Sequence, residues 1–328
     1  MKLATLATET ANENTRDLDT MSVVELLSAM NREDQTVPAA VAAAIPEIAR
    51  AVDAIIASRG RGGRLIYLGA GTSGRLGVLD AVECPPTFGT DPGEVLGLIA
   101  GGERAFLQAV EGAEDNPDLA VADLRAVGAT AADVIVGLAA SGRTPYVVGG
   151  LDHARSIGAA TVSISCNVGA EISAHADVAI EVNTGPEALT GSTRLKAGSA
   201  QKLICNMLTT ASMVKTGKAF GNLMVDVRPT NAKLVDRARR IVSAATGADA
   251  EQSAATLERA GGHAKTAVVM LLADCDLAAA LDRLDRGRGS VRAAVDLPAS
   301  TLPAGTVPAG TVPASTEPSN ALLTSTSL

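Results

Sequence analysis

The fold is decided by Leu-Ile-Tyr-Leu-Gly-Ala-Gly-Thr-Ser-Gly-Arg-Leu-Gly-Val-Leu-Asp-Ala-Val-Glu-Cys-Pro-Pro, residues 65–86. This stretch begins with a short apolar run over residues 65–68, typical of a buried parallel strand, and continues with four glycines within nine residues. Such a pattern predicts a tight turn from a strand into a helix, where backbone N–H groups can surround an anion. The residues that shape the turn and supply its hydroxyl donors are Gly69, Gly71, Thr72, Ser73 and Gly74. A phosphate is the ligand that this turn favours.

The same strand, turn and helix order recurs along the middle of the chain. Apolar runs of strand length alternate with helical stretches, which predicts a doubly wound parallel sheet of the α/β class. In such a sheet the ligands lie at the carboxyl ends of the strands. The further strands are expected at residues 95–100, 134–139, 161–165 and 178–182.

Helices are expected before and after the sheet region along the chain. Residues 22–30 and 37–58 have apolar side chains at helical spacing, as do several segments between residues 231 and 296. After Pro298 the chain consists mainly of Ala, Thr, Pro, Gly and Ser, a composition that predicts disorder. The expected parts are an N-terminal helical segment, a sheet domain, a small helical module and a disordered tail, at residues 1–60, 61–230, 231–296 and 297–328.

Composition excludes several classes of partner. The 328-residue chain has 28 Lys and Arg against 36 Asp and Glu, and a net charge of −8 argues against general binding to nucleic acid or to an anionic membrane. The four cysteines and three histidines lack the spacing of metal ligands, so we expect no metal. The N-terminus has no signal-peptide pattern and no apolar run approaches a membrane span, which predicts a cytoplasmic protein.

A second turn of the same kind follows the strand expected at residues 134–139. It contains Ser141, Gly142, Arg143 and Thr144 before a proline suited to the first turn of a helix. Hydroxyl groups and one cation at a helix start predict a second anion-binding turn. Two such turns on neighbouring strands suit a phosphorylated ligand larger than phosphate itself.

A third polar stretch, residues 185–202, precedes a helix expected from about residue 203 to 214. It concentrates hydrogen-bond donors and positive charge, with Ser192, Thr193 and Lys196 as candidate contacts to an anionic ligand. A capped helix with lysines in solvent explains the stretch equally well.

Carboxyl groups stand out at two places. Glu83 comes directly before Cys84-Pro85-Pro86, so that rigid prolines would hold it beyond the end of a helix. Glu114 belongs to an acidic, glycine-containing segment at residues 110–116, which is either a helix end with a functional carboxylate or a charged surface turn.

Together these motifs resemble those of the N-acetylmuramic acid 6-phosphate etherases. That family is a bacterial branch of the sugar isomerase (SIS) domain proteins and is related to glucokinase regulatory protein. The resemblance extends over residues 8–296, and its most specific motifs are Glu83-Cys-Pro-Pro-Thr-Phe-Gly, Val110-Glu-Gly-Ala-Glu-Asp, Ala140-Ser-Gly-Arg-Thr-Pro-Tyr and Phe220-Gly-Asn-Leu-Met-Val-Asp.

The resemblance implies a SIS-type, flavodoxin-like three-layer fold and a homodimer. It also implies cleavage, without a cofactor, of the ether between D-lactate and C3 of the phosphorylated sugar, in the recycling of cell-wall amino sugars. By resemblance Glu83 is the acid that protonates the departing lactate, and we assign Glu114 as the base at C2. Partial burial beside Cys84 and the prolines would raise the pKa of Glu83 as an acid requires.

The phosphate contacts expected are Ser73, Ser141, Arg143 and Thr144, supported by Thr72 and Gly74, with Ser192, Thr193 and Lys196 as further candidates. Arg143 is alternatively a partner of the lactyl carboxylate. A sugar-phosphate sensor would keep the hydroxyl-bearing turns without the two glutamates, and a sugar-phosphate isomerase on the same fold would also use a base at C2.

Overall fold

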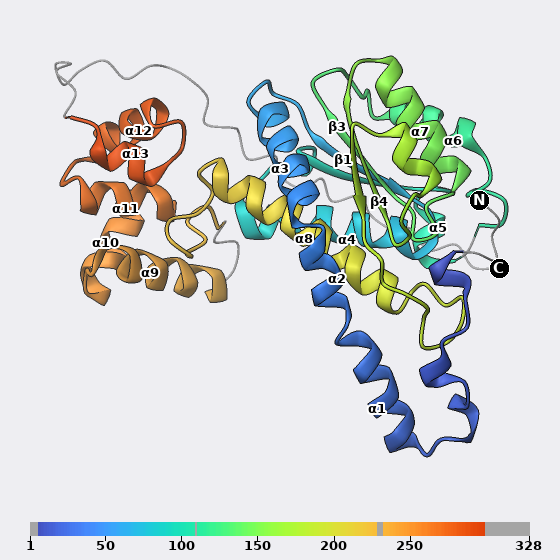
Figure 1. The fold of residues 1–328 in the computed structure, drawn as a ribbon. Helices are drawn as coiled ribbons and strands as arrows, with labels where there is room; N and C mark the ends of the chain where they lie inside the picture. Colours follow the sequence, from blue (N-terminus) through green and yellow to red (C-terminus); the bar gives the residue numbers. More distant parts are fainter. Residues whose placement is uncertain (1–5, 109, 228–231, 299–328) are drawn as a thin grey trace, which may run out of the picture. The chain divides into compact units, whose positions relative to one another are not determined.

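The computed structural model describes residues 6–108, 110–227 and 232–298. Its centre is a parallel sheet of five strands in the order β2-β1-β3-β4-β5, with helices on both faces (Figure 1). The strands are β1 Leu65–Gly69, β2 Val95–Ile99, β3 Val134–Leu138, β4 Ala160–Ser165 and β5 Val178–Glu181. The expected parallel α/β architecture is therefore confirmed.

The helices and short 3-10 turns of the described residues follow in chain order. Before and within the sheet region they are η2 Ala7–Glu9, η3 Glu13–Thr15, η4 Leu18–Thr20, α1 Val23–Asp34, α2 Val37–Ala43, α3 Ile45–Arg59, α4 Gly71–Phe88, α5 Arg104–Leu107, α6 Pro117–Ala126, α7 Pro145–Ser156, η5 Glu171–His175 and α8 Lys196–Lys215. The C-terminal ones are α9 Ala232–Thr246, α10 Ala250–Arg259, α11 Ala264–Leu272, α12 Leu277–Arg286 and α13 Val291–Asp296.

Successive side chains of each strand point to opposite faces of the sheet, and each face has its own apolar core. Leu65 and Tyr67 of β1 pack in the cluster formed with α2, α3, α4 and α8. Ile66 and Leu68 pack in the cluster formed with α6 and α7. The result is a three-layer sandwich in which the strands read as continuous apolar runs because both faces are buried.

The chain changes direction across the sheet between β1 and β3. From β1 the chain passes through α4 on one face to the edge strand β2, whereas from β3 it passes through α7 on the other face to β4. The helices that follow these two adjacent strands therefore diverge, and the carboxyl ends of β1 and β3 are the switch point at which sheets of this kind bind ligands. Both predicted anion-binding turns lie at this point.

The helix expected at residues 37–58 is divided, which corrects the prediction. α2 ends at Ala43 and α3 begins at Ile45, with Ala44 outside the helical region at φ −93° and ψ 1°. Pro46 accounts for the break, because its ring nitrogen has no hydrogen to donate to Ala42 and its ring clashes with that carbonyl group.

The prolines of the Cys84-Pro85-Pro86 motif also differ from expectation, because they lie within α4 and not after it. α4 continues for one more turn to Phe88, which is buried in the core, as is Cys84. Gly89 then ends the helix at φ +62°, where its N–H donates to the carbonyl oxygen of Pro85 at 3.0 Å.

α8 begins seven residues earlier than the predicted start near residue 203. The fully buried carboxylate of Glu187 accepts hydrogen bonds from the N–H groups of Lys196 and Ala197 at 2.8 and 2.9 Å. This cap satisfies backbone donors at the helix start, and burial raises the pKa of the Glu187 carboxyl.

The C-terminal helices have a separate apolar cluster, as a helical module requires. α9, α10 and α11 confirm the helices expected before residue 272, and α12 and α13 follow them. Residues before the predicted boundary also pack into this cluster, namely Phe220, Leu223, Met224, Val225 and Val227. The predicted tail lies outside the described residues, apart from its first two positions.

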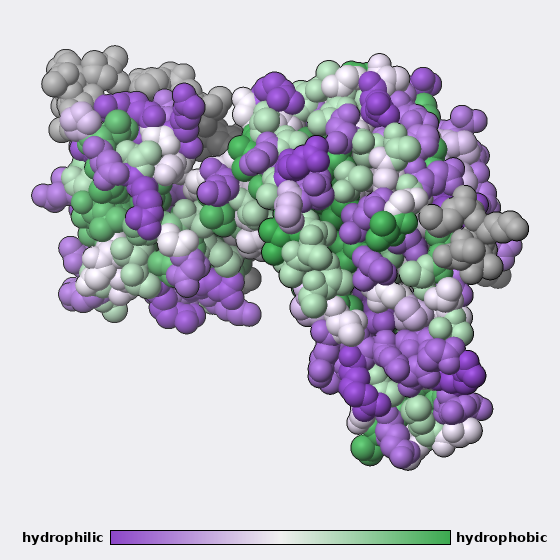
Figure 2. Space-filling view, viewed as in Figure 1, coloured by the Kyte–Doolittle hydropathy of each residue, from purple (hydrophilic) through white to green (hydrophobic). Residues whose placement is uncertain are grey.

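Some apolar side chains of the N-terminal helices face solvent. On α1, Val23, Val24 and Leu27 are all more than half exposed, and Figure 2 shows apolar surface at the tip of this helix. Exposed apolar groups close together on one helix are typical of a surface that another molecule covers. Within the described ranges, no helix combines the length and apolarity needed to span a membrane.

Candidate functional site

The two glycine-containing turns lie next to each other at one edge of the sheet. β1 and β3 are adjacent parallel strands, and Gly69 at the end of β1 pairs in register with Leu138 at the end of β3. The prediction that these turns follow neighbouring strands is confirmed. Side chains from both can therefore contact a single ligand.

The first turn brings its backbone close to the strand. Gly71 has φ +53°, and a Cβ at Gly74 would lie 2.6 Å from the carbonyl oxygen of Gly69, so neither position accommodates another residue without strain. Ser73 is buried at 7% exposure and donates its hydroxyl hydrogen to Oε1 of Gln201 at 2.9 Å. Thr72 is partly buried close to Gly198 of α8.

The second turn is equally compact. Gly142 has φ +75°, and a Cβ there would lie 2.4 Å from Cβ of Ala170. Ser141 and Thr144 are partly buried, and neither hydroxyl group forms a hydrogen bond to any described residue. Nε of Arg143 is buried without a hydrogen bond within the described chain and lies 3.7 Å from Oε2 of Glu171. Three donors are thus available at one turn.

A buried asparagine from the loop after β4 fixes this second turn. Nδ2 of Asn167 donates to the carbonyl oxygens of Ala140 and Ser141 at 3.2 and 3.3 Å. The same amide group is bonded to Thr8, donating to its hydroxyl and accepting from its N–H. The N-terminal segment therefore holds the loop that carries Ser141.

Glu114 lies beside the second turn. Glu114 is exposed in the loop between α5 and α6, which agrees with the interpretation of this segment as a charged surface turn. Its backbone carbonyl oxygen accepts a hydrogen bond from the N–H of Tyr146 at 3.0 Å. Tyr146 is the second residue of α7 and directly follows Thr144-Pro145. One backbone bond thus joins the carboxylate-bearing loop to the helix start that carries Thr144.

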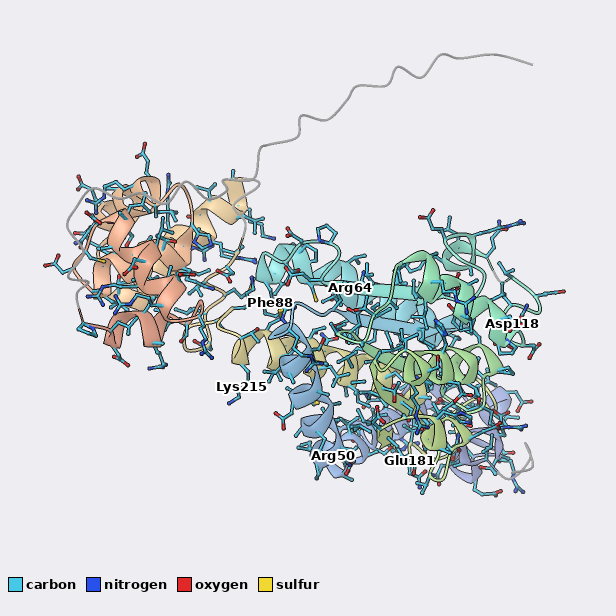
Figure 3. The ribbon with its side chains drawn as sticks, turned by 90° about the horizontal axis from the view of Figure 1, so that it is seen from above. Arg50, Arg64, Phe88, Asp118, Glu181 and Lys215 are labelled. Atoms are coloured by element: carbon cyan, nitrogen blue, oxygen red, sulfur yellow. The ribbon has the colours of Figure 1, made fainter. Side chains whose placement is uncertain are left out.

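Glu83 lies on α4 at a distance from the first turn. It lies ten residues after Ser73 on α4, a distance of about 15 Å along the helix axis. Phe88, at the end of α4, and Asp118, four residues after Glu114, lie at opposite ends of the sheet region in Figure 3. The expected partial burial of Glu83 is wrong, because the residue is exposed beside the buried Cys84.

Cys84 and Asp80 have structural roles in the same helix. The thiol of Cys84 is buried, which raises its pKa to about 12, and it donates to the carbonyl oxygen of Asp80. Burial raises the pKa of the Asp80 carboxyl, whose oxygens accept from the Tyr67 and Thr209 hydroxyl groups at 2.9 and 3.2 Å. These contacts fix α4 against β1 and α8.

The third polar stretch divides into two kinds of residue. Ser192 and Thr193 are partly buried, with hydroxyl groups that bond to no described residue. Lys196 is only 2% exposed, and its ammonium group binds Oε2 of Glu33 at 2.8 Å. Its charge is therefore already compensated by a carboxylate of α1.

Several residues that support the site were missed from sequence. Gln201 carries a detectable signal: it lies three and four residues from Ile204, Cys205 and Ala197, on the apolar face of a helix once that helix is extended to residue 196. Asn167, Thr8 and Glu33 carry none, because their partners are 19 to 163 residues away in the chain.

Two family models match the sheet region of the chain. A model of the glucokinase regulatory protein N-terminal SIS domain matches residues 47–155, and a SIS domain model matches residues 126–211. Among solved structures, a phosphoheptose isomerase from Neisseria gonorrhoeae gives a TM-score of 0.44 at 17% identity, over 58% of this chain and 98% of that one.

Curated relatives match almost the whole chain. A protein of Mycolicibacterium smegmatis is 62% identical over 295 residues, which cover 90% of this chain and 99% of its own. A protein of Exiguobacterium is 60% identical over 290 residues, covering 88% and 99% of the two chains. Both are named N-acetylmuramic acid 6-phosphate etherase, and identity of this extent means that the chain belongs to the N-acetylmuramic acid 6-phosphate etherase family.

Proposed function

We propose that this protein cleaves the D-lactyl ether of N-acetylmuramic acid 6-phosphate, releasing D-lactate and N-acetylglucosamine 6-phosphate. The observation that carries the proposal is the identity of 62% to a protein of that name over 99% of the relative's length. The position of two hydroxyl-bearing turns at the switch point of the sheet supports a sugar phosphate as ligand.

The phosphate binds between the two turns in this proposal. The N-terminus of α4 with Thr72, Ser73 and Gly74 lies on one side, and Ser141 and Thr144 lie on the other. Arg143, whose Nε has no hydrogen-bond partner among the described residues, supplies positive charge to the phosphate or to the lactyl carboxylate. Ser192 and Thr193 remain further candidates, and Lys196 does not, because it is bound to Glu33.

The reaction requires an acid and a base. Opening of the sugar ring makes C1 an aldehyde, which acidifies the hydrogen on C2. Glu114 removes that proton, Glu83 protonates the C3 oxygen as lactate departs, and water then adds at C3 of the unsaturated aldehyde. The backbone hydrogen bond that holds the Glu114 loop to Tyr146, at the start of α7, supports the part of Glu114 in this assignment.

The separation of Glu83 from this place supports a homodimer with shared sites. Glu83 shares the outer face of α4 with the exposed Leu79 and Val82, and α5 presents Leu107 at 85% exposure. Leu107 also lines a groove of about 640 Å³, whose other walls are formed by residues of α4, α6 and the edge strand β2. We propose that a second copy packs on this face and receives Glu83 in its own site.

A phosphorylated sugar is charged and does not cross a bilayer unaided, so we also propose that the protein acts in the cytoplasm. The test of the reaction does not depend on this location.

Product analysis tests the reaction. The purified protein is incubated with N-acetylmuramic acid 6-phosphate in water enriched in 18O, and D-lactate and the labelled position are determined. Elimination followed by addition of water places solvent oxygen at C3 of the sugar, whereas hydrolysis at the lactyl carbon places it in lactate. Binding without lactate release would favour a sensor, and an aldose–ketose product would favour an isomerase.

A further inference from the structure

Gln201 occupies a position where an apolar side chain is expected. It lies in the second turn of α8, is fully buried, and shares the core-facing side of the helix with Ala197, Ile204 and Cys205. Burial of an amide group is unfavourable unless its hydrogen-bonding atoms are satisfied. Only half of this amide is satisfied, because Oε1 accepts from Ser73 while Nε2 is buried with no partner in the described chain.

The bond to Gln201 has a consequence for Ser73. A serine hydroxyl carries a single hydrogen, and Ser73 donates it to Oε1 of Gln201. A phosphate monoester near neutral pH presents acceptor oxygens, so it needs that hydrogen as well. In the observed arrangement the hydroxyl group of Ser73 is not available to a phosphate.

A half-turn of the Gln201 amide removes the conflict. Nε2 would then donate to Oγ of Ser73, which frees the serine hydrogen for the phosphate without a change in side-chain volume.

We propose that Gln201 is a positioning residue that controls the donor direction of Ser73. Its amide oxygen accepts the serine hydrogen in the empty site, and its amide nitrogen donates to the serine oxygen when a phosphate is bound. The inference rests on the proposed function only in taking a sugar phosphate as the ligand.

A double-mutant cycle tests the inference with Gln201→Met, Ser73→Ala and the pair. Each protein is assayed for kcat and KM of lactate release and for binding of N-acetylglucosamine 6-phosphate, with N-acetylglucosamine as the ligand without phosphate. Gln201→Met should weaken binding of the phosphorylated ligand about three- to tenfold, the scale of one hydrogen bond, and the loss should fall on KM rather than kcat.

In the Ser73→Ala background the same substitution should change binding less than twofold, because its effect passes through the serine. Equal losses in both backgrounds, or equal losses for the two ligands, would mean that Gln201 only fills space, and would overturn the inference. Gln201→Asn keeps the amide group but places it too far from Ser73 for a hydrogen bond. It should weaken binding of the phosphorylated ligand to the same extent, and it replaces Gln201→Met if that variant does not fold.

The two proposals fail separately. Lactate release by the wild type with additive mutational effects would refute the role of Gln201 and leave the proposed function standing. Coupled effects on N-acetylglucosamine 6-phosphate binding without any lactate release would support the role of Gln201 and refute the etherase activity.

Discussion

Hydroxyl and backbone donors, and not clustered cations, dominate the polar groups at the ends of β1 and β3. The hydroxyl groups of Ser141 and Thr144 have no partner among the described residues. Arg143 is the one cation of these two turns apart from Arg75, whose guanidinium binds carbonyl oxygens of α5. Donors of this kind bind an anion at close range and do not create a long-range positive field. A protein with a net charge of −8 can thus bind a phosphate locally without attracting polyanions.

The two glutamates can be distinguished by isotope exchange. Glu83→Gln should lower D-lactate release at least about 100-fold, as should Glu114→Gln, because each removes one proton transfer. In deuterated water Glu83→Gln should still exchange hydrogen at C2 of the substrate, since the base remains, whereas Glu114→Gln should not. Mass spectrometry of recovered substrate measures this exchange.

Glu251→Gln, a neutralisation of an exposed glutamate on α10, is the matched control and should release lactate like the wild type. Wild-type release by Glu83→Gln would remove that residue from the mechanism, and exchange lost in Glu83→Gln instead of Glu114→Gln would reverse the two roles.

At the scale of elements, the Ser141 turn depends on the absence of one methyl group. Gly142 and Gly62 have nearly the same backbone angle, φ +75° and +76°, but a Cβ at Gly142 would lie 2.4 Å from Ala170 and a Cβ at Gly62 would contact nothing within 4 Å. Gly142→Ala should therefore cost about 1–3 kcal/mol more in unfolding free energy than Gly62→Ala, because only the former overpacks the core.

The same pair of variants separates the site from general stability. Gly142→Ala should also raise KM, since the added methyl group displaces Ser141 and Arg143, whereas Gly62→Ala should leave KM unchanged. Urea denaturation and initial-rate kinetics provide the two measurements, and equal destabilisation by both substitutions would show that the turn relaxes around the methyl group.

A buried ion pair joins α1 to the start of α8. Glu33 binds the ammonium of Lys196 and accepts hydrogen bonds from Asn12 and Asn14, and both charged side chains are at most 10% exposed. Glu33→Gln leaves a buried ammonium without its counter-ion and should cost about 3 kcal/mol at neutral pH. Glu13→Gln breaks the exposed pair with Arg16 and should change the unfolding midpoint little.

The loss of stability in Glu33→Gln should depend on pH in a defined direction. Burial pushes the pKa of Glu33 upward, but hydrogen bonds from Lys196, Asn14 and Asn12 hold it below the ordinary value of 4.5. A lowered folded-state pKa gives stability that is complete above about pH 4.5 and is lost as the pH falls through the folded value. The difference in unfolding free energy between the wild type and Glu33→Gln should therefore become smaller below pH 4.5. A difference that becomes larger in acid would contradict the assignment.

How far the sequence predicts the structure depends on the range of the interactions involved. The strands and both glycine-containing turns were predictable because apolar runs and glycines act locally. The start of α8 was not, because its cap is Glu187, and neither was the anchoring of the Ser141 turn, because Thr8 contacts Asn167 across 159 positions. The continuation of α4 was not predictable either, because prolines such as Pro85 and Pro86 usually end a helix. Here the burial of Phe88 stabilises one further turn.

At the scale of the whole molecule, the described residues form a core around the sheet and a separate core among the C-terminal helices. The sheet has one apolar cluster on each face, and the C-terminal helices share a third with residues 220–227. We accordingly propose that the helical module begins near Phe220 and not at residue 231. An ion-pair group within it, in which Asp226 binds Lys218 and Lys265, gives the Phe220–Asp226 motif a structural role.

Complementation between inactive variants tests whether two copies share each site. If Glu83 acts in the site that holds Glu114 of the other copy, a heterodimer of Glu83→Gln with Glu114→Gln contains one site with both glutamates and one with neither. Random exchange makes half of the dimers mixed, so a mixture of the two inactive proteins should recover about a quarter of the wild-type rate.

The recovered rate must require contact between the copies. Introducing Val82→Asp into both variants places a charge on the outer face of α4, next to Glu83, and should abolish complementation and shift the sedimentation of the protein towards a monomer. Leu281→Asp, at a comparably exposed apolar position on α12, is the matched control and should change neither complementation nor sedimentation. A mixture that stays inactive although exchange is shown by differently tagged copies would mean that Glu83 and Glu114 serve one chain. The α4 helix would then have to bend or move to bring Glu83 to the start of α7.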